Sequence, residues 1–396
     1  MIGQKIKQLR LEMGISQEKL IHGLFDRTYL SQIERGLKVP PRETLEKLAE
    51  RLGIPVHELT EYSETTERIS TMLSSARETK NLATIREAWE TALKVQSIEQ
   101  MGECVLAWAS IAAEQDATSV DLLDAINHVL MLMSNTAGPE SSLVLQILMI
   151  RANTYYYLGM FDQAVWAYRS LEIRHPPDEL LGRVKVSLGS SLMALMRYEE
   201  ALQQFSEALI VVDITDLTRA RAHQGVGGCS RYLRLWEQAI QHLEKACVLF
   251  AGLEEEYRYV LTRHSLGILL LDKFEFDKAR TIFAEVQTFY IAHEMSLHLA
   301  ELYEEMARIE FYKKNYQRGN TWCNRGLKLL DGLNGPLAGR LFLWKCWSFY
   351  ITGKTALAED AWQAARSLLN AQLKMTIDTL DPNMTEETKK MFHDMI

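Results

Sequence analysis

The chain has 396 residues, 47% hydrophobic and 24% charged, a composition that is ordinary for a globular protein of two or three domains. Glycine (21) and proline (8) are scarce, which excludes collagen-like and low-complexity chains and disfavours a turn-rich β protein. Residues 1–62 hold ten Lys/Arg against nine Asp/Glu, so they carry a net charge of +1, whereas the rest of the chain carries −9. An acidic body repels nucleic acid, and any DNA contact is therefore expected from the first 62 residues.

Several classes of protein are not expected from the sequence. The five cysteines form no C-x-x-C pair and are predicted to be reduced thiols in a cytoplasmic protein, with no metal site. No apolar run approaches the roughly 18 residues of a membrane span, and the charged N-terminus does not resemble a secretory signal. No catalytic grouping or cofactor motif can be placed, so we expect neither an enzyme nor a membrane partner, and no cofactor.

The first 60 residues predict five short helices with clear start and stop signals. Apolar residues recur at helical spacing from Ile2 until Gly14. Ser16 and Asp26 are suited to cap the second and third helices, and Gly36 to end the third.

Two more short helices are predicted at 44–52 and 55–59. The polar stretch 61–70 is predicted to be a linker between a DNA-binding domain (1–60) and a larger domain (71–380).

Two helices joined by a tight turn form a helix-turn-helix, whose second helix enters the major groove of DNA. The strings Ile15–Leu20 and Arg27–Gly36 resemble the Xre/Cro family, and the short turn 22–26 resembles the PlcR/NprR branch of the RRNPP group. This resemblance implies an all-α chain: a five-helix, lambda-repressor-like head followed by a TPR-like solenoid that responds to short secreted peptides.

The start of the third helix is expected to face the DNA bases, where Arg can bind guanine and Gln adenine. The N-terminus of the second helix suits a phosphate, and Arg10 or Lys5 are further candidates for the DNA backbone. Glu34 is expected to be a charge partner in helix packing. The predicted DNA-binding residues are Gln17, Arg27, Thr28, Ser31, Gln32, Lys38 and Arg42; the resemblance implies the same roles for Gln17, Arg27, Thr28 and Gln32.

The remainder of the chain repeats a motif in which an aromatic residue is followed by Ala three positions later and a bulky residue four after that. The copies begin at Phe161, Tyr198, Trp236, Phe276, Tyr316 and, more weakly, Thr355. Helical hairpins of this kind bury their apolar faces by stacking into a right-handed solenoid, as in the tetratricopeptide repeat (TPR), which the pattern resembles. Residues 381–396 are predicted to form a capping helix. Close helix approaches are predicted at Gly159, Gly189, Gly227 and Gly267.

The concave wall of such a solenoid is lined by the first helix of each hairpin. Side-chain amides there can bind an extended peptide backbone, arginines its carboxylates, and aromatic rings its apolar side chains; the resemblance implies the use of Asn. The predicted peptide-binding residues are Asn153, Tyr156, Arg183, Arg221, Gln224, Arg231, His264, Glu304, Arg308 and Trp347.

Together these features predict a peptide-responsive, quorum-sensing transcription regulator. Its expected partners are double-stranded operator DNA, a short linear signalling peptide and a second copy of the chain, because one head makes few phosphate contacts. Two alternatives stay open. One is a Rap-like signalling adaptor that acts on phosphorelay or response-regulator proteins, and the other is a repressor that responds to no peptide.

Overall fold

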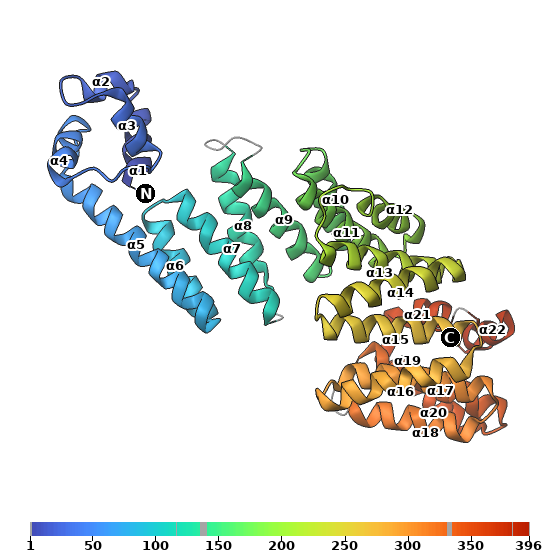
Figure 1. The fold of residues 1–396 in the computed structure, drawn as a ribbon. Coiled ribbons are helices and arrows are strands. Elements are labelled where there is room, and N and C mark those ends of the chain that lie inside the picture. The colour runs from blue at the N-terminus through green and yellow to red at the C-terminus, as the bar shows by residue number, and fades with distance from the viewer. Residues whose placement is uncertain (1, 116, 135–140, 331–334, 382, 396) are drawn as a thin grey trace. The chain divides into compact units, whose positions relative to one another are not determined.

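The computed structural model describes residues 2–115, 117–134, 141–330, 335–381 and 383–395, and within these ranges the regular structure is entirely helical (Figure 1). The chain divides into two compact units, residues 1–176 and 177–396. The predicted all-α class is confirmed.

Unit 1 contains α1 (Ile2–Glu12), α2 (Gln17–Ile21), α3 (Arg27–Glu34), α4 (Arg42–Arg51), α5 (Val56–Thr79), α6 (Leu82–Lys94), α7 (Ile98–Glu114), α8 (Val120–Met133), α9 (Ser142–Tyr157) and α10 (Phe161–Glu172). Unit 2 contains α11 (Asp178–Ala194), α12 (Tyr198–Ala208), α13 (Asp216–Tyr232), α14 (Trp236–Gly252), α15 (Glu256–Asp272), α16 (Phe276–Ala292), α17 (Ser296–Tyr312), α18 (Tyr316–Leu329), α19 (Pro336–Ile351), α20 (Thr355–Leu369), the 3₁₀ turn η1 (Asn370–Gln372), α21 (Leu373–Thr379) and α22 (Glu386–Asp394).

The head is built from α1 to α4 and the start of α5. The Ser16 side chain accepts a hydrogen bond from the Lys19 N–H, and Asp26 accepts one from the Tyr29 N–H, which confirms both predicted N-caps. A shared core, in which Ile6, Leu30, Ile33 and Leu48 are fully buried, holds these short helices together. The caps and this core fix the angle between α2 and α3.

The structure differs from the prediction in the segment that follows the head. Residues 61–70, expected to be a linker, lie inside the continuous helix α5. Leu59 belongs to the core of the head, whereas Ile69, Leu73 and Ala76 are buried in the part of α5 that packs against α6 and α7. The buried residues 66, 69, 73 and 76 recur at helical spacing and so favour a continued helix, although its exposed faces are polar.

The repeat motif marks where the second helix of each hairpin begins, because each predicted leading residue is the first residue of a helix. These helices are α10, α12, α14, α16, α18 and α20. Two residues before each of them the backbone is left-handed, at Gly159, Met196, Arg234, Phe274, Lys314 and Gly353. The same turn therefore closes every hairpin from α9 to α20.

Small residues on the first helix of a hairpin leave room for a bulky residue on the second helix, seven positions after the leading residue. A Cβ added to Gly189 would lie 2.9 Å from Phe205, and one added to Gly267 would lie 2.5 Å from Phe283. Gly227 approaches Leu243 in the same way. Gly159 was predicted to mark a close helix approach, but its φ of +73° and the open space around it mark a turn.

The C-terminal segment packs on the last repeat and also reaches earlier helices. Phe392 is fully buried and stacks on Trp362 of α20, as expected for a capping helix; residues 382 and 396 of that predicted helix lie outside the described residues. Asp381 accepts a hydrogen bond from Arg308 of α17, and the Asn383 amide donates one to the carbonyl of Asp272 at the end of α15. The segment is thus tied to three repeats rather than to one.

Candidate functional site

The outer surface of α3 brings together most of the residues predicted to contact DNA. Arg27 and Thr28 are exposed on its first turn, and Ser31 and Gln32 are half-buried one turn later. Gln17, at the start of α2, accepts a hydrogen bond from Arg27 (Nε to Oε1, 3.3 Å). The two helix starts therefore form one polar surface.

A buried ion pair supports this surface from below. The Arg10 guanidinium donates to Glu34 of α3 through Nε (2.7 Å) and Nη2 (3.2 Å), and both side chains are less than 10% exposed. Glu34 also accepts from Gln17 (Nε2 to Oε2, 2.7 Å), so one carboxylate links α1, α2 and α3. The expectation for Glu34 is confirmed. Arg10, a candidate for the DNA backbone, instead lies in the interior.

The two cations expected to hold the DNA backbone are exposed beyond α3. The Lys38 ammonium lies 5.4 Å from the centre of the Tyr29 ring, a cation–π contact that fixes its direction. Arg42 forms an exposed ion pair with Glu46 (3.2 Å). Such a pair contributes little to stability, so the guanidinium can exchange its partner for a phosphate at small cost.

Polar contacts in unit 2 join the first helix of one hairpin to the first helix of the next. Gln224 of α13 donates to Thr262 of α15 (3.1 Å), and Arg231 of α13 pairs with Asp272 of α15 (2.6 Å). Further along, Arg340 of α19 forms a bidentate pair with Glu304 of α17, from Nε to Oε1 and from Nη2 to Oε2. These contacts fix the spacing between neighbouring hairpins.

The Arg231–Asp272 pair belongs to a larger ionic cluster, which is made of Arg231, Asp272, Glu305, Arg308 and Asp381. Arg308 pairs with Asp272 (2.8 Å), Asp381 (2.8 Å) and Glu305 (2.5 Å), and it is 3% exposed. Despite burial, the surrounding carboxylates hold the pKa of Arg308 well above its usual range. Burial raises the pKa of Glu305, partly opposed by Arg308.

The residues predicted to bind peptide fall into two sets. His264, Glu304 and Arg308 lie in the interior, where their partners are Tyr290, Arg340 and the ionic cluster respectively. Side chains that reach the surface, wholly or in part, are Arg183, Arg221, Gln224, Arg231 and Trp347 in unit 2, and Asn153 and Tyr156 in unit 1. The Asn153 carbonyl accepts from the Tyr168 hydroxyl (2.6 Å).

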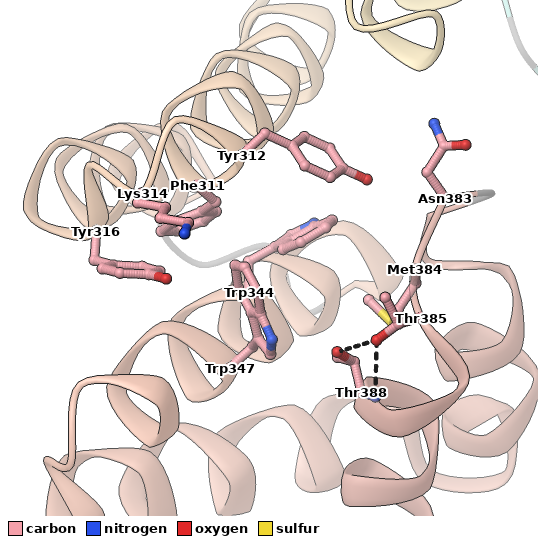
Figure 2. Close-up of a pocket in the computed structure, with 10 residues that line it drawn as sticks. All are labelled: Phe311, Tyr312, Lys314, Tyr316, Trp344, Trp347, Asn383, Met384, Thr385 and Thr388. Atoms are coloured by element: carbon pink, nitrogen blue, oxygen red, sulfur yellow. Dashed lines mark hydrogen bonds between the residues drawn. The ribbon is translucent and has the colours of Figure 1, made fainter.

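Trp347 lines an apolar pocket of about 220 Å³ within unit 2 (Figure 2). Its other lining residues come from the α17–α18 turn, from α19 and from the C-terminal segment. They are Phe311, Tyr312, Lys314, Tyr316, Trp344, Asn383, Met384, Thr385 and Thr388.

Sequence reasoning missed the acids of the ionic cluster and the C-terminal wall of this pocket. Asp272 ends an apolar run in α15, which is the available signal for a buried acid, but its partners are 36 and 41 positions away. Asp381 is 73 positions from Arg308, a distance that no local pattern bridges.

The head resembles proteins of the helix-turn-helix family in sequence. A helix-turn-helix family model matches residues 6–59. The transcriptional repressor RstR of the cryptic phage CTXphi from Vibrio cholerae is 42% identical over 67 residues, 16% of this chain and 60% of that protein. The control protein C.BamHI from Bacillus amyloliquefaciens is 37% identical over 65 residues, 16% of this chain and 80% of that protein. The chain belongs to the helix-turn-helix family.

The repeats resemble solved structures in fold, at low sequence identity. The apo form of the quorum sensor NprR from B. thuringiensis has a TM-score of 0.61 at 14% identity, covering 93% of this chain and all of that one. A Rap protein complexed with Competence and Sporulation Factor has a TM-score of 0.57 at 11% identity, covering 76% and 86%. The predicted fold, a helix-turn-helix head followed by TPR-like repeats, is confirmed.

The described ranges contain neither a candidate metal site nor a candidate membrane span. No group of three or more His, Cys, Asp or Glu side chains there is placed to hold a metal ion. No helix in those ranges is long and apolar enough to cross a membrane.

Proposed function

We propose that this chain regulates transcription by binding operator DNA through its head and a short linear peptide through its repeats. The observation that carries the proposal is the polar surface of α2 and α3, capped at both helix starts and supported by the Arg10–Glu34 pair. Membership of the helix-turn-helix family supports the DNA-binding half. The likeness in fold to a quorum sensor and to a Rap protein complexed with Competence and Sporulation Factor supports the sensing half.

In this proposal, Arg27, Thr28, Ser31 and Gln32 read base edges, and Gln17, Lys38 and Arg42 bind the DNA backbone. Side chains that read bases give sequence preference, whereas those that bind phosphates give affinity without preference. The two roles therefore predict different consequences of mutation.

The DNA-binding half is tested by selecting sites from a random duplex library with the full chain and then comparing two variants. Gln32→Ala is expected to relax the preference at one base position by about 1–3 kcal/mol. Lys38→Ala is expected to weaken the binding of all DNA sequences alike. It should also lower the slope of log affinity against log salt concentration by about one, which corresponds to one lost phosphate contact. An unchanged base preference in Gln32→Ala would exclude α3 as the reading helix.

The sensing half is tested with a randomised heptapeptide library and the immobilised full chain. We expect enriched peptides whose affinity falls in Gln224→Ala, since this side chain offers an amide group to a peptide backbone. Lys38→Ala, a head variant, is the matched control and should bind the peptides normally. A library that enriches nothing would favour a repressor that responds to no peptide.

A further inference from the structure

The pocket beside Trp347 has an aromatic wall with little freedom to move. Phe311 stacks on Trp344 (ring centres 5.8 Å apart, 20° between planes), and Trp347 meets Phe311 edge-on at the same distance. The Trp344 indole N–H donates to Glu304 (3.2 Å), which Arg340 holds in place. Because the indole N–H of Trp344 already has a hydrogen-bond partner in Glu304, the side chain presents only its apolar ring surface to the pocket.

The facing wall belongs to the C-terminal segment, and the ionic cluster holds it there. Asp381 accepts from Arg308 and from the Asn383 backbone N–H (both 2.8 Å), while the Asn383 amide donates to the Asp272 carbonyl (2.7 Å). Met384 and Thr388 follow directly and line the pocket opposite the rings (Figure 2). The pocket is complete only while the segment is docked.

We propose that this pocket is the anchor site for one aromatic side chain of the peptide ligand, and that its occupation stabilises the docked C-terminal segment. The inference rests on the proposed function and specifies the ligand class. An apolar cavity of about 150 Å³ accepts benzene, so about 220 Å³ has room for a phenyl group. Aromatic walls suit edge-to-face contact with such a ring. Lys314, the one charged residue among those described as lining the pocket, disfavours a cation.

The experiment uses the full chain labelled with ¹³C at its methionine methyl groups, because Met384 lines the pocket. The probe is N-acetyl-L-phenylalaninamide, and N-acetylglycinamide is the control compound without a ring. The Met384 signal, assigned through Met384→Leu, should shift with the aromatic probe by its ring current and stay unchanged with the control. No shift with the aromatic probe would overturn the proposal.

A variant that fills the pocket makes the test specific. Thr388→Phe places a ring in the space while keeping the backbone hydrogen bond from residue 388 to the Thr385 hydroxyl, and it should weaken the probe at least about tenfold. Thr379→Phe is the matched control, since Thr379 is exposed on α21 and does not line the pocket. Equal affinity of the wild type and Thr388→Phe would overturn the assignment.

The link to the C-terminal segment has its own readout. Saturating probe should slow amide hydrogen exchange in α22, and Asp381→Asn, which weakens the docking, should speed that exchange and weaken the probe. Probe binding without slower exchange would overturn the stabilisation of the segment. A library heptapeptide that binds the wild type and Thr388→Phe equally would exclude the pocket yet leave peptide sensing intact. A phenylalaninamide response without any peptide binder would count against the proposed function alone.

Discussion

The buried Arg10–Glu34 ion pair joins α1 to α3 in the head. Replacing one partner leaves the other charge buried and unpaired, so Glu34→Gln should destabilise the head by about 3–5 kcal/mol. Hydrogen exchange in α1 and α3 measures the change. Glu46→Gln, which breaks the exposed pair with Arg42, is the control and should cost less than about 1 kcal/mol. Equal losses of stability in Glu34→Gln and Glu46→Gln would show that the buried pair stabilises the head no more than the exposed pair does.

His264 makes the stability of unit 2 depend on pH. Burial, with contributions from His298 and Arg231, lowers its pKa to about 4, and its Nδ1 lies 3.1 Å from the Tyr290 hydroxyl. An unfolded histidine titrates near 6.5, so between pH 6.5 and 4 the unfolded chain binds the extra proton. Stability should therefore fall by up to about 3 kcal/mol as the pH drops through this window.

The control for this pH dependence is His264→Phe, which cannot be protonated. Urea unfolding at pH 7.0, 5.5 and 4.5 should show a shallower loss of stability in the variant than in the wild type. Parallel pH curves for the two proteins would contradict the buried, neutral state of His264.

Single residues were predictable where their role is local. Ser16, Asp26 and Glu34 were assigned correctly because a cap needs only its own helix start and Glu34 occupies a fixed position on α3. His264 and Arg308 were placed on a surface by helical phase alone. Helical phase does not reveal that α16, the second helix of the same hairpin, contacts His264, or that the C-terminal segment pairs with Arg308.

Among the elements, the contact between the two helices of a hairpin limits what the repeats tolerate. A Cβ at Gly267 would lie 2.5 Å from the ring of Phe283, so Gly267→Ala should destabilise unit 2 by about 1–3 kcal/mol. Gly252→Ala in α14 is the matched control, because open space surrounds Gly252 and alanine favours the helix; it should be neutral or stabilising by up to about 1 kcal/mol. Urea unfolding measures both, and similar values would contradict the packing described for α15 and α16.

Helices with a repeated signal were predictable to the residue. The leading residues of six motif copies are the first residues of six helices, because the aromatic residue, the alanine and the turn before them all report one recurring hairpin. The path of α5 could not be predicted in the same way. Residues 61–70 are mostly polar, so their sequence carries no repeated apolar signal for a helix, although they lie inside α5.

For the whole molecule, a regulator with one reading helix per chain requires two chains on the DNA for tight binding. We expect two half-sites separated by about 10 base pairs, or a multiple of this, since both reading helices must enter the major groove from the same side of the duplex. Inserting 5 base pairs between the half-sites should abolish cooperative binding in a mobility-shift assay, and inserting 10 should largely restore it. Indifference to both insertions would mean that the chain binds DNA as a monomer.

The uninterrupted path of α5 has a consequence for how a signal could leave the repeats. Each residue of an α-helix advances the chain by about 1.5 Å and turns it by about 100°. The number of residues in α5 therefore sets the rotation of the head about the axis of this helix relative to the first hairpins. A single alanine added after Glu64 would swing the reading helix about a quarter of a revolution away from its half-site. Seven added alanines would bring it almost back into line. Grafting another head onto these repeats thus requires matching rotation as well as length.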